Sequence, residues 1–305
     1  MRIIIDCDPG NGVPGANVDD AVAITYAVRE PSLDVAAIWT VFGNTPAPDG
    51  ALAVTRLLDD LGRAGEIPVR VGSCRPLVGD AGHWRSVLDA PGRDPATRHL
   101  WTSPAPAAAP SEETPLAVLD GDLGANPADV TIVAIGPLTD LARLAARPGG
   151  ALTRVAGIWL MGGALGFRDL VDTNFAVDPE AANTVLASPV PLTIVPLDVT
   201  RTTHLSPATW RRIRAADPGL ADRVAVWLDP WMAYSRRTRP VNGMWLHDLV
   251  VPAALAHPEI VHRQTARVEV RPDGKLVRSA AGREVTLVTR VDNAALVDLW
   301  AGALS

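Results

Sequence analysis

Four aspartates in the first twenty residues, Asp6, Asp8, Asp19 and Asp20, are the side chains best suited to chemistry. No Lys, Arg or His occurs from position 3 to position 28, so the sequence offers these carboxylates no nearby counter-charge. Carboxylates that converge repel one another unless a cation lies among them. Their hard oxygens favour Ca²⁺ or Mg²⁺ over zinc, and the chain has no Cys/His grouping with zinc spacing. We interpret this stretch as a metal site.

The local elements would bring these side chains to one end of a sheet. Three isoleucines at positions 3–5 predict a strand buried on both faces, which leaves the sheet at the Pro-Gly pair at 9–10. Asp19 and Asp20 open a predicted helix that runs to Val28, where the helix dipole tolerates their charge. Ligands bind at the carboxyl ends of parallel strands. For any one aspartate, a plain turn or helix-cap role remains the alternative.

The rest of the chain alternates strands with helices, which predicts a single α/β domain over residues 1–305. We expect a Rossmann-like, mostly parallel sheet flanked by helices, followed by a late β-hairpin and a terminal helix from Asn293. The strands expected after the first are 33–41, 69–72, 130–135, 155–161 and 191–197, and the hairpin is 266–270 with 283–289. The helices expected are 49–61, one following 136, one opening at 178–183, then 207–216, 220–237 and 247–256.

Further polar residues follow the later strands. Asn44 comes just after the second strand, although Gly-Asn-Thr is also an ordinary turn. Asp172 and Asn174 lie in an irregular stretch, and His247-Asp248 stands at the start of a predicted helix, where His247 could be only a cap. If the strands are parallel, these residues share one rim with the first aspartates.

Composition narrows the class of protein. The 305 residues carry a net charge of −6 and a single lysine, Lys275, which argues against a nucleic-acid surface and against a lysine-dependent mechanism. No stretch of about twenty apolar residues and no basic leader occurs, so we expect no membrane partner and a cytoplasmic location. Cys7 and Cys74 are too few for a disulfide framework and are expected to be buried thiols.

Two aromatic groups allow more than one interpretation. Residues 75–113 are weakly patterned, as in a disordered segment or a lid, and contain His83, Trp84, His99 and Trp101. These rings could close over a base, or could simply pack on the surface. Trp227, Trp231 and Tyr234 share one face of a predicted helix, where core packing is the default.

The ordered motifs resemble the nucleoside hydrolase family (the inosine-uridine preferring nucleoside ribohydrolases) along nearly the whole chain. These motifs are Asp-x-Asp-Pro-Gly with Asp-Asp-Ala, Gly-Asn, Gly-Pro-Leu-Thr, Met-Gly-Gly-Ala, Val-Asp-Pro-Glu-Ala-Ala, Pro-Leu-Asp-Val-Thr and His-Asp. The resemblance implies a Ca²⁺-dependent hydrolase that cleaves the N-glycosidic bond of a small-molecule ribonucleoside. It also implies a homodimer or homotetramer.

The resemblance also implies a role for each matching residue. Asp8, Asp20, Asp248 and the main-chain carbonyl of Ile135 would bind Ca²⁺, and Asp8 would deprotonate the attacking water. The ribose hydroxyls would be held by Asp19, Asn44, Asp172 and Asn174, and Asp6 would support the metal site from behind. His247 would lie near the departing base and donate a proton or hydrogen bond to it.

Two departures from the family pattern affect base recognition. Residues 11–18 lie between the Gly and the Asp-Asp pair, seven residues more than relatives have, which could lengthen the pocket rim. The usual His-Gly loop is also not recognisable around His83. Separately, relatives usually have Glu where this chain has the expected ribose ligand Asp172. The expected reaction passes through an oxocarbenium-like ribosyl transition state, which nearby carboxylates stabilise.

Two other functions use the same residues. An aspartyl-phosphate type phosphatase also begins with a strand followed by Asp-x-Asp, but it needs a lysine near the site, and Lys275 is badly placed in the late hairpin. A nucleoside- or sugar-binding protein could keep the pocket without turnover.

Overall fold

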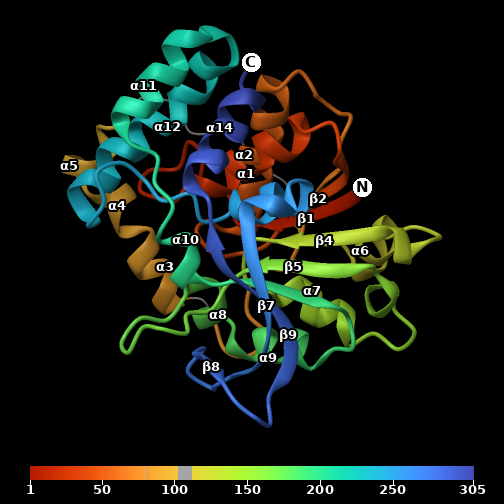
Figure 1. Ribbon diagram of the computed structural model, residues 1–305. Coiled ribbons are helices and arrows are strands. Elements are labelled where there is room, and N and C mark those ends of the chain that lie inside the picture. Colours follow the sequence, from red (N-terminus) through yellow and green to blue (C-terminus); the bar gives the residue numbers. More distant parts are fainter. Residues whose placement is uncertain (81, 102–111) are drawn as a thin grey trace.

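The computed structural model describes residues 1–80, 82–101 and 112–305, and its centre is one nine-stranded sheet (Figure 1). The strand order is β3-β2-β1-β4-β5-β6-β9-β7-β8, and all neighbours from β3 to β9 are parallel. The strands are β1 (Arg2–Cys7), β2 (Asp34–Thr40), β3 (Val69–Val71), β4 (Val130–Ala134), β5 (Gly157–Met161), β6 (Leu192–Val195), β7 (Val261–Val270), β8 (Leu276–Arg278) and β9 (Arg283–Val291). The predicted α/β class with a mostly parallel sheet is confirmed.

Helices cover both faces of this sheet. The α-helices are α1 (Asp19–Arg29), α2 (Ala47–Asp60), α3 (Gly82–Leu88), α4 (Ala90–Arg93), α5 (Pro95–Arg98), α6 (Leu116–Asp122), α7 (Thr139–Ala145), α8 (Thr173–Ala176), α9 (Pro179–Ala187), α10 (Leu197–Thr200), α11 (Pro207–Ala216), α12 (Pro218–Thr238), α13 (Val250–Ala256) and α14 (Asn293–Ala303). Short 3₁₀ turns lie at η1 (Pro127–Asp129), η2 (Ala151–Arg154) and η3 (Pro258–Ile260). No helix in the described part of the chain is both long and apolar enough to span a membrane.

The three isoleucines of β1 explain how one strand serves two cores. Ile3 and Ile5 belong to a core that includes residues of α1, α2, α12, α13 and α14, whereas Ile4 belongs to a second core with residues of α6, α7 and α9. Side chains alternate along a strand, so consecutive isoleucines must face opposite layers. In Figure 1 α1, α2 and α14 lie above the sheet, and α7 and α9 lie below it. The sequence-based expectation of a strand buried on both faces is therefore confirmed.

The late hairpin is longer than predicted and is part of the same sheet. β7 pairs antiparallel with β9 from Val261 to Val268, and β8 adds an antiparallel strand at the edge. β9 lies parallel to β6, which joins the hairpin to the central sheet. The outer ends of β7 and β9 are set by pairing between residues far apart in the sequence. The turn signals mark only the tip of the hairpin, so the predicted strands, 266–270 and 283–289, are too short.

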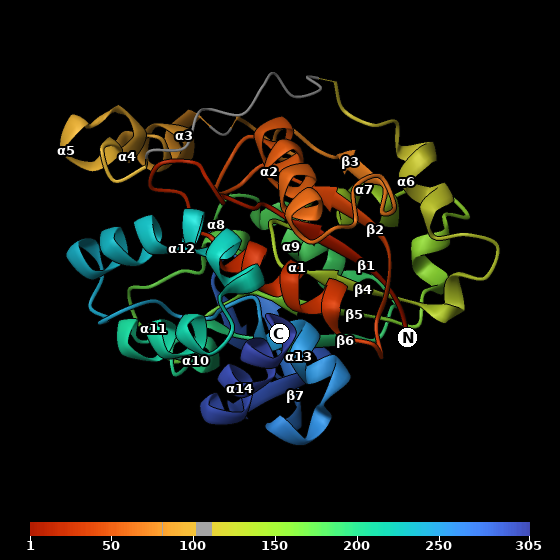
Figure 2. The same cartoon turned by 90° about the horizontal axis from the view of Figure 1, so that it is seen from above.

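One group of helices lies beyond the carboxyl ends of the strands. Figures 1 and 2 both place α3–α5 and α12 on the side of the sheet away from the N-terminus, where β1 ends. The weakly patterned segment therefore contains three short helices, while residue 81 and residues 102–111, which also belong to it, lie outside the described residues. Trp101 is buried in the core and contacts the Tyr234 ring, with centroids 5.8 Å apart. Trp227 and Trp231 are buried in the same core, as predicted for that helix face.

Two predicted boundaries are wrong near the site. The strand expected over 191–197 ends at Val195, because Pro196 has no N–H for the sheet, and α10 begins at Leu197. The helix expected from His247 begins at Val250, so His247 and Asp248 lie in the turn before α13. Their side chains are therefore placed by a turn and not by helix periodicity.

Candidate active site

A cavity of about 360 Å³ lies where the strand order reverses between β1 and β4. Such a switch point is where open α/β sheets bind ligands. Seven of the residues predicted from the sequence line this cavity: Asp19, Asn44, Ile135, Asp172, Asn174, His247 and Asp248. Asn17 also lines it, so the extra segment at 11–18 contributes to the cavity wall.

Three carboxylates from distant parts of the chain converge at this cavity. Asp19 and Asp20 begin α1, and Asp248 lies in the turn before α13; each offers a carboxylate oxygen within 4.8 Å of the other two. All three side chains are buried. Asp8 adjoins this trio, because its backbone N–H donates to Asp20 Oδ1 at 2.9 Å. Within the described residues, the grouping brings two of the predicted metal ligands together with the predicted ribose ligand Asp19.

The side chain of Asp8 is fixed by the turn after β2. Asp8 Oδ2 accepts a hydrogen bond from the backbone N–H of Asn44 at 2.6 Å. A Cβ on Gly43 would lie 1.9 Å from the same oxygen, so only glycine allows this approach. Asp8 is not one of the three residues whose oxygens lie within 4.8 Å of one another. The Asp8 carboxylate therefore stands beside the trio, held by the neighbouring strand's turn.

The electrostatics of these carboxylates fit a bound cation. Asp8 Oδ1, Asp19 Oδ1 and Asp20 Oδ2 are buried without a hydrogen-bond partner among the described residues. Burial, and then repulsion from Asp20, raises the pKa of Asp19 to about 8, and burial raises the pKa of Asp20 to about 6. Burial followed by neighbouring carboxylates raises the pKa values of Asp8 and Asp248 well above the usual range. Unpartnered carboxylate oxygens are the donor set of a hard divalent cation, so these residues could hold a metal ion.

A second buried carboxyl pair lies behind the site. Burial, and then the charge of Asp140, raises the pKa of Asp6 well above its usual range. Asp140 Oδ1 accepts hydrogen bonds from the backbone N–H and the hydroxyl of Ser73, at 2.7 and 2.5 Å. Asp6, like Asp8 and Asp20, is not among the residues that line the cavity.

Asn174 and Asp172 are both committed to backbone contacts. Asn174 Nδ2 donates to the carbonyls of Ile135 and Met161, at 3.0 and 3.1 Å, which leaves its Oδ1 for the cavity. Asp172 caps α8 by accepting from the Phe175 N–H at 3.2 Å, and burial raises its pKa to about 6. The Ile135 carbonyl, one of the predicted metal ligands, is therefore already a hydrogen-bond acceptor, with a second lone pair remaining.

His247 is held as a neutral ring. Its Nδ1 lies 2.7 Å from the Thr200 hydroxyl, and its ring centroid is 5.6 Å from that of Trp245. Burial, and then the positive charges of Arg239 and Arg201, lowers the pKa of His247 to about 3. If the Thr200 hydroxyl donates to Nδ1, the ring proton is on Nε2. His247 can then donate a hydrogen bond but carries no positive charge at neutral pH.

The charged and aromatic lining residues that the sequence did not predict are Arg201, Arg239 and Trp245. Arg201 follows α10 and Arg239 follows α12, and no motif connects them in the sequence. The Trp two positions before His247 was the one available signal, because aromatic rings beside a titratable residue often line a ligand site.

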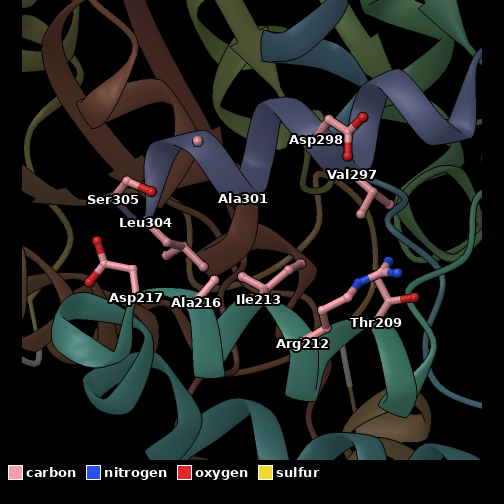
Figure 3. Close-up of a pocket in the computed structure, with 11 residues that line it drawn as sticks. Thr209, Arg212, Ile213, Ala216, Asp217, Val297, Asp298, Ala301, Leu304 and Ser305 are labelled. Atoms are coloured by element: carbon pink, nitrogen blue, oxygen red, sulfur yellow. The ribbon is translucent and has the colours of Figure 1, made fainter.

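A larger cavity, of about 530 Å³, lies between α11 and α14 and contains none of the predicted site residues. Figure 3 shows Ile213, Leu304, Val297 and Arg212 between the two helices, with Asp298 on the side of α14 away from α11. No group of three metal-ligating side chains occurs there within the described part of the chain. We therefore locate the candidate active site at the smaller cavity.

Comparisons with known proteins agree in one family. The model of the inosine-uridine preferring nucleoside hydrolase family matches residues 3–298. The chain is 33% identical over 324 residues to the pyrimidine-specific ribonucleoside hydrolase RihA of Klebsiella pneumoniae subsp. pneumoniae, with 100% of this chain and 98% of the relative covered. RihA of Citrobacter koseri is also 33% identical, over 325 residues, with the same coverage.

Solved structures show the same fold. The purine-preferring ribonucleoside hydrolase of Gardnerella vaginalis superposes with a TM-score of 0.83 at 22% identity, covering 100% of this chain and 98% of the other. The plant nucleoside hydrolase PpNRh1 gives a TM-score of 0.81 at 23% identity, covering 99% and 98%. The predictions of this family and of a hydrolytic enzyme are confirmed. The protein belongs to the inosine-uridine preferring nucleoside hydrolase family.

Proposed function

We propose that the protein hydrolyses the N-glycosidic bond of ribonucleosides in a Ca²⁺-dependent reaction, releasing ribose and the free base. One observation carries this proposal. The buried carboxylates of Asp19, Asp20 and Asp248 meet beside a cavity at the sheet's switch point, and Asp19 Oδ1 and Asp20 Oδ2 lack hydrogen-bond partners in the described chain. Because the RihA relatives are named pyrimidine-specific, pyrimidine ribonucleosides are the first substrates to test.

The residues proposed to hold Ca²⁺ are Asp8, Asp20, Asp248 and the main-chain carbonyl of Ile135. When bound, Ca²⁺ would bring ribose hydroxyls and a water together and would lower the pKa of that water. Asp8 is the proposed base, since its Oδ1 has no hydrogen-bond partner among the residues that the structure describes and its Oδ2 is fixed by the Asn44 N–H. A fixed carboxylate can take the proton of the attacking water without reorganising.

The proposed ribose ligands are Asp19, Asn44, Asp172 and Asn174, all of which line the cavity. Asp19 and Asp172 place negative charge beside the sugar, which favours the positive charge that develops on the ribosyl group. Asn174 can present only Oδ1, because its Nδ2 donates to two backbone carbonyls. His247 is proposed to donate a hydrogen bond from Nε2 to the departing base.

The test is ribose release measured as reducing sugar from uridine, cytidine and inosine, with and without a chelator. Asp8→Asn and Asp248→Ala should each lower release by at least about 1000-fold while the fold persists, because each removes a charge from the centre of the site. Asp34→Asn is the matched control, since Asp34 is exposed at the start of β2. Ribose release by the Asp8 or Asp248 variant at near wild-type rate would refute the assignment.

No observation favours the two rival functions. Lys275 lies between β7 and β8 and forms an ion pair with Asp273 at 3.7 Å, so it supplies no charge to a phosphoryl group at the cavity. Binding of ribonucleosides without ribose production on long incubation would instead favour a binding protein. The homodimer or homotetramer implied by the family is tested by light scattering of the purified protein.

A further inference from the structure

Two arginines give the cavity a positive wall that faces its carboxylates. Arg201 and Arg239 both line the cavity that Asp19 and Asp248 also line. Arg201 stacks on Trp245, whose ring centroid lies 5.6 Å from that of His247, and Arg239, Trp245 and His247 line one small recess, so both arginines belong to the end of the cavity proposed for the leaving base. The cavity therefore has carboxylates where the ribosyl group would lie and guanidinium groups beside His247, where the base would depart, and Arg239 is also close enough to Asp19 to lower the pKa of that carboxyl.

Each guanidinium is held on aromatic rings. The Arg201 guanidinium carbon lies 4.9 Å from the Trp245 ring centroid and 5.2 Å from that of Phe167. The Arg239 guanidinium carbon lies 4.4 Å from the Trp231 centroid and 5.8 Å from that of Tyr234. Stacking on ring faces fixes a guanidinium plane while leaving its N–H groups free to donate.

Neither arginine has an acidic partner among the described residues. No carboxylate oxygen there lies within the 4.0 Å of an ion pair, and the Arg239 side chain makes one long hydrogen bond, at 3.4 Å, to the Thr238 hydroxyl. Burial lowers the pKa of Arg239, and the nearby Tyr234 and Asp19 groups offset this effect only in part. A negative group of the ligand would offset that cost.

We propose that Arg201 and Arg239 stabilise the base as it departs as an anion. Cleavage of an N-glycosidic bond separates charge, positive on the ribosyl group and negative on the base, and the cavity has the same polarity. The inference rests on the proposed hydrolase function and names the substrate class. The site favours bases whose anion spreads onto exocyclic carbonyl oxygens, so uracil is a better leaving group than cytosine.

The step balances without an added reactant. The C1′–N bond breaks with its electron pair on the base nitrogen, and the water oxygen bonds to C1′ while its proton passes to Asp8. The base anion, held by the two guanidinium groups, then takes up a proton from the Asp8 carboxyl or from solvent and leaves as the neutral base. His247 donates a hydrogen bond throughout and transfers no proton.

The experiment compares leaving groups in arginine variants. Arg201→Gln and Arg239→Gln keep a polar stem, and Arg212→Gln is the matched control because Arg212 is exposed in the other cavity. The substrates are uridine, 5-fluorouridine and 4-nitrophenyl β-D-ribofuranoside, whose leaving groups form increasingly stable anions. Each variant should lose about 10- to 100-fold in kcat/KM for uridine, the value of a charge-assisted hydrogen bond, and under about threefold for the nitrophenyl riboside. Thermal unfolding checks that each variant is folded.

The outcomes separate this inference from the proposed function. A selective loss on uridine, smaller on 5-fluorouridine, supports the inference. An equal loss on all three substrates, or no loss, overturns it while ribose release by the wild type still supports the hydrolase. A wild-type protein that releases ribose from none of the three substrates overturns the proposed function and the inference together.

Discussion

At the scale of the residue, the site is defined by buried carboxylates that accept few hydrogen bonds from the described chain. Asp8, Asp19, Asp20 and Asp248 are all buried, and each has a raised pKa whose largest cause is burial. Such a group keeps its proton to a higher pH than an ordinary aspartate does, unless a cation replaces that proton. Cation binding at this site must therefore release protons, which makes metal affinity, and with it stability, depend on pH.

The metal-free protein is predicted to become less stable as the pH rises. The pKa of Asp19 is about 8 in the folded chain against 3.8 for a free Asp, so from about pH 4 to pH 8 the folded state holds a proton that the unfolded state has lost. The contribution of this proton to stability is present below about pH 4 and disappears as the pH passes about 8. Thermal unfolding in chelator should show a falling midpoint over this range.

Added Ca²⁺ should oppose that fall, because it binds the deprotonated folded site and not the unfolded chain. The gain in midpoint on adding Ca²⁺ should increase with pH. Asp19→Asn is the control, since it removes the carboxyl with the raised pKa and should flatten the decline in chelator. A gain that is constant across the pH range would contradict a site built from protonated carboxyls.

The sequence predicted the aspartates of the site but not its arginines. Asp8, Asp19 and Asp20 share one short stretch without counter-charges, and Asp248 follows a recognisable histidine, so motif and spacing were enough to select them. Arg201 and Arg239 follow two helices whose arrangement depends on tertiary packing, and neither stands in a motif. Their approach to one cavity could be learned only from the fold.

At the scale of the element, the turn between β2 and α2 positions Asp8. Gly43 gives Asp8 Oδ2 the space it occupies, and the next backbone N–H, of Asn44, donates to that oxygen. From α3, Arg85 donates to the carbonyls of Gly43 and Asn44, at 2.8 and 3.0 Å, so the turn is held from the side that α3 covers. The β2–α2 turn and α3 together therefore hold the Asp8 carboxylate in place.

Gly43→Ala is predicted to displace that carboxylate. The added Cβ would lie 1.9 Å from Asp8 Oδ2, so Asp8 must rotate away or the turn must move, and either change should lower kcat by about 100-fold or more. The matched control is Gly121→Ala in α6, where a Cβ meets nothing within 4 Å. Ribose release and circular dichroism should show an inactive, folded Gly43 variant and an active Gly121 variant. Full activity in both would contradict the close approach.

Elements were predicted best where the pattern is local. The buried strands β1, β4 and β5 follow from their apolar runs, and the caps at Asp178 and Asp292 mark helix starts. The helices α3 to α5 have no buried side chain among them, so the segment lacks the apolar period from which a helix is read. The prediction of a helix from His247 is wrong because the apolar run that follows His247 and Asp248 begins too close to them to show where the turn ends.

At the scale of the molecule, one core joins distant parts of the chain. Ile3 and Ile5 of β1, Val133 of β4, Val224 of α12 and Trp300 of α14 belong to the same cluster of buried side chains. The parallel sheet, which orders its strands 3-2-1-4-5-6 before the hairpin, brings the first aspartates and Asp248 to one edge. A site assembled from both ends of the sequence requires this core to be intact, so activity and global stability should be lost together on denaturation.

A single domain over residues 1–305 predicts one cooperative unfolding transition, which paired variants in α12 can test. Val224 and Val226 stand two positions apart, but their exposed fractions are 1% and 58%. Val224→Ala should lower the free energy of unfolding by about 2 to 3 kcal/mol, because it removes buried methyl groups and leaves a cavity, whereas Val226→Ala should change it by less than about 0.5 kcal/mol. Urea unfolding followed by tryptophan fluorescence and by circular dichroism should give coincident curves that shift together in the Val224 variant. If the fluorescence curve alone shifted, α12 would unfold separately from the sheet, and the carboxylates and arginines of the cavity would be held by two independent units.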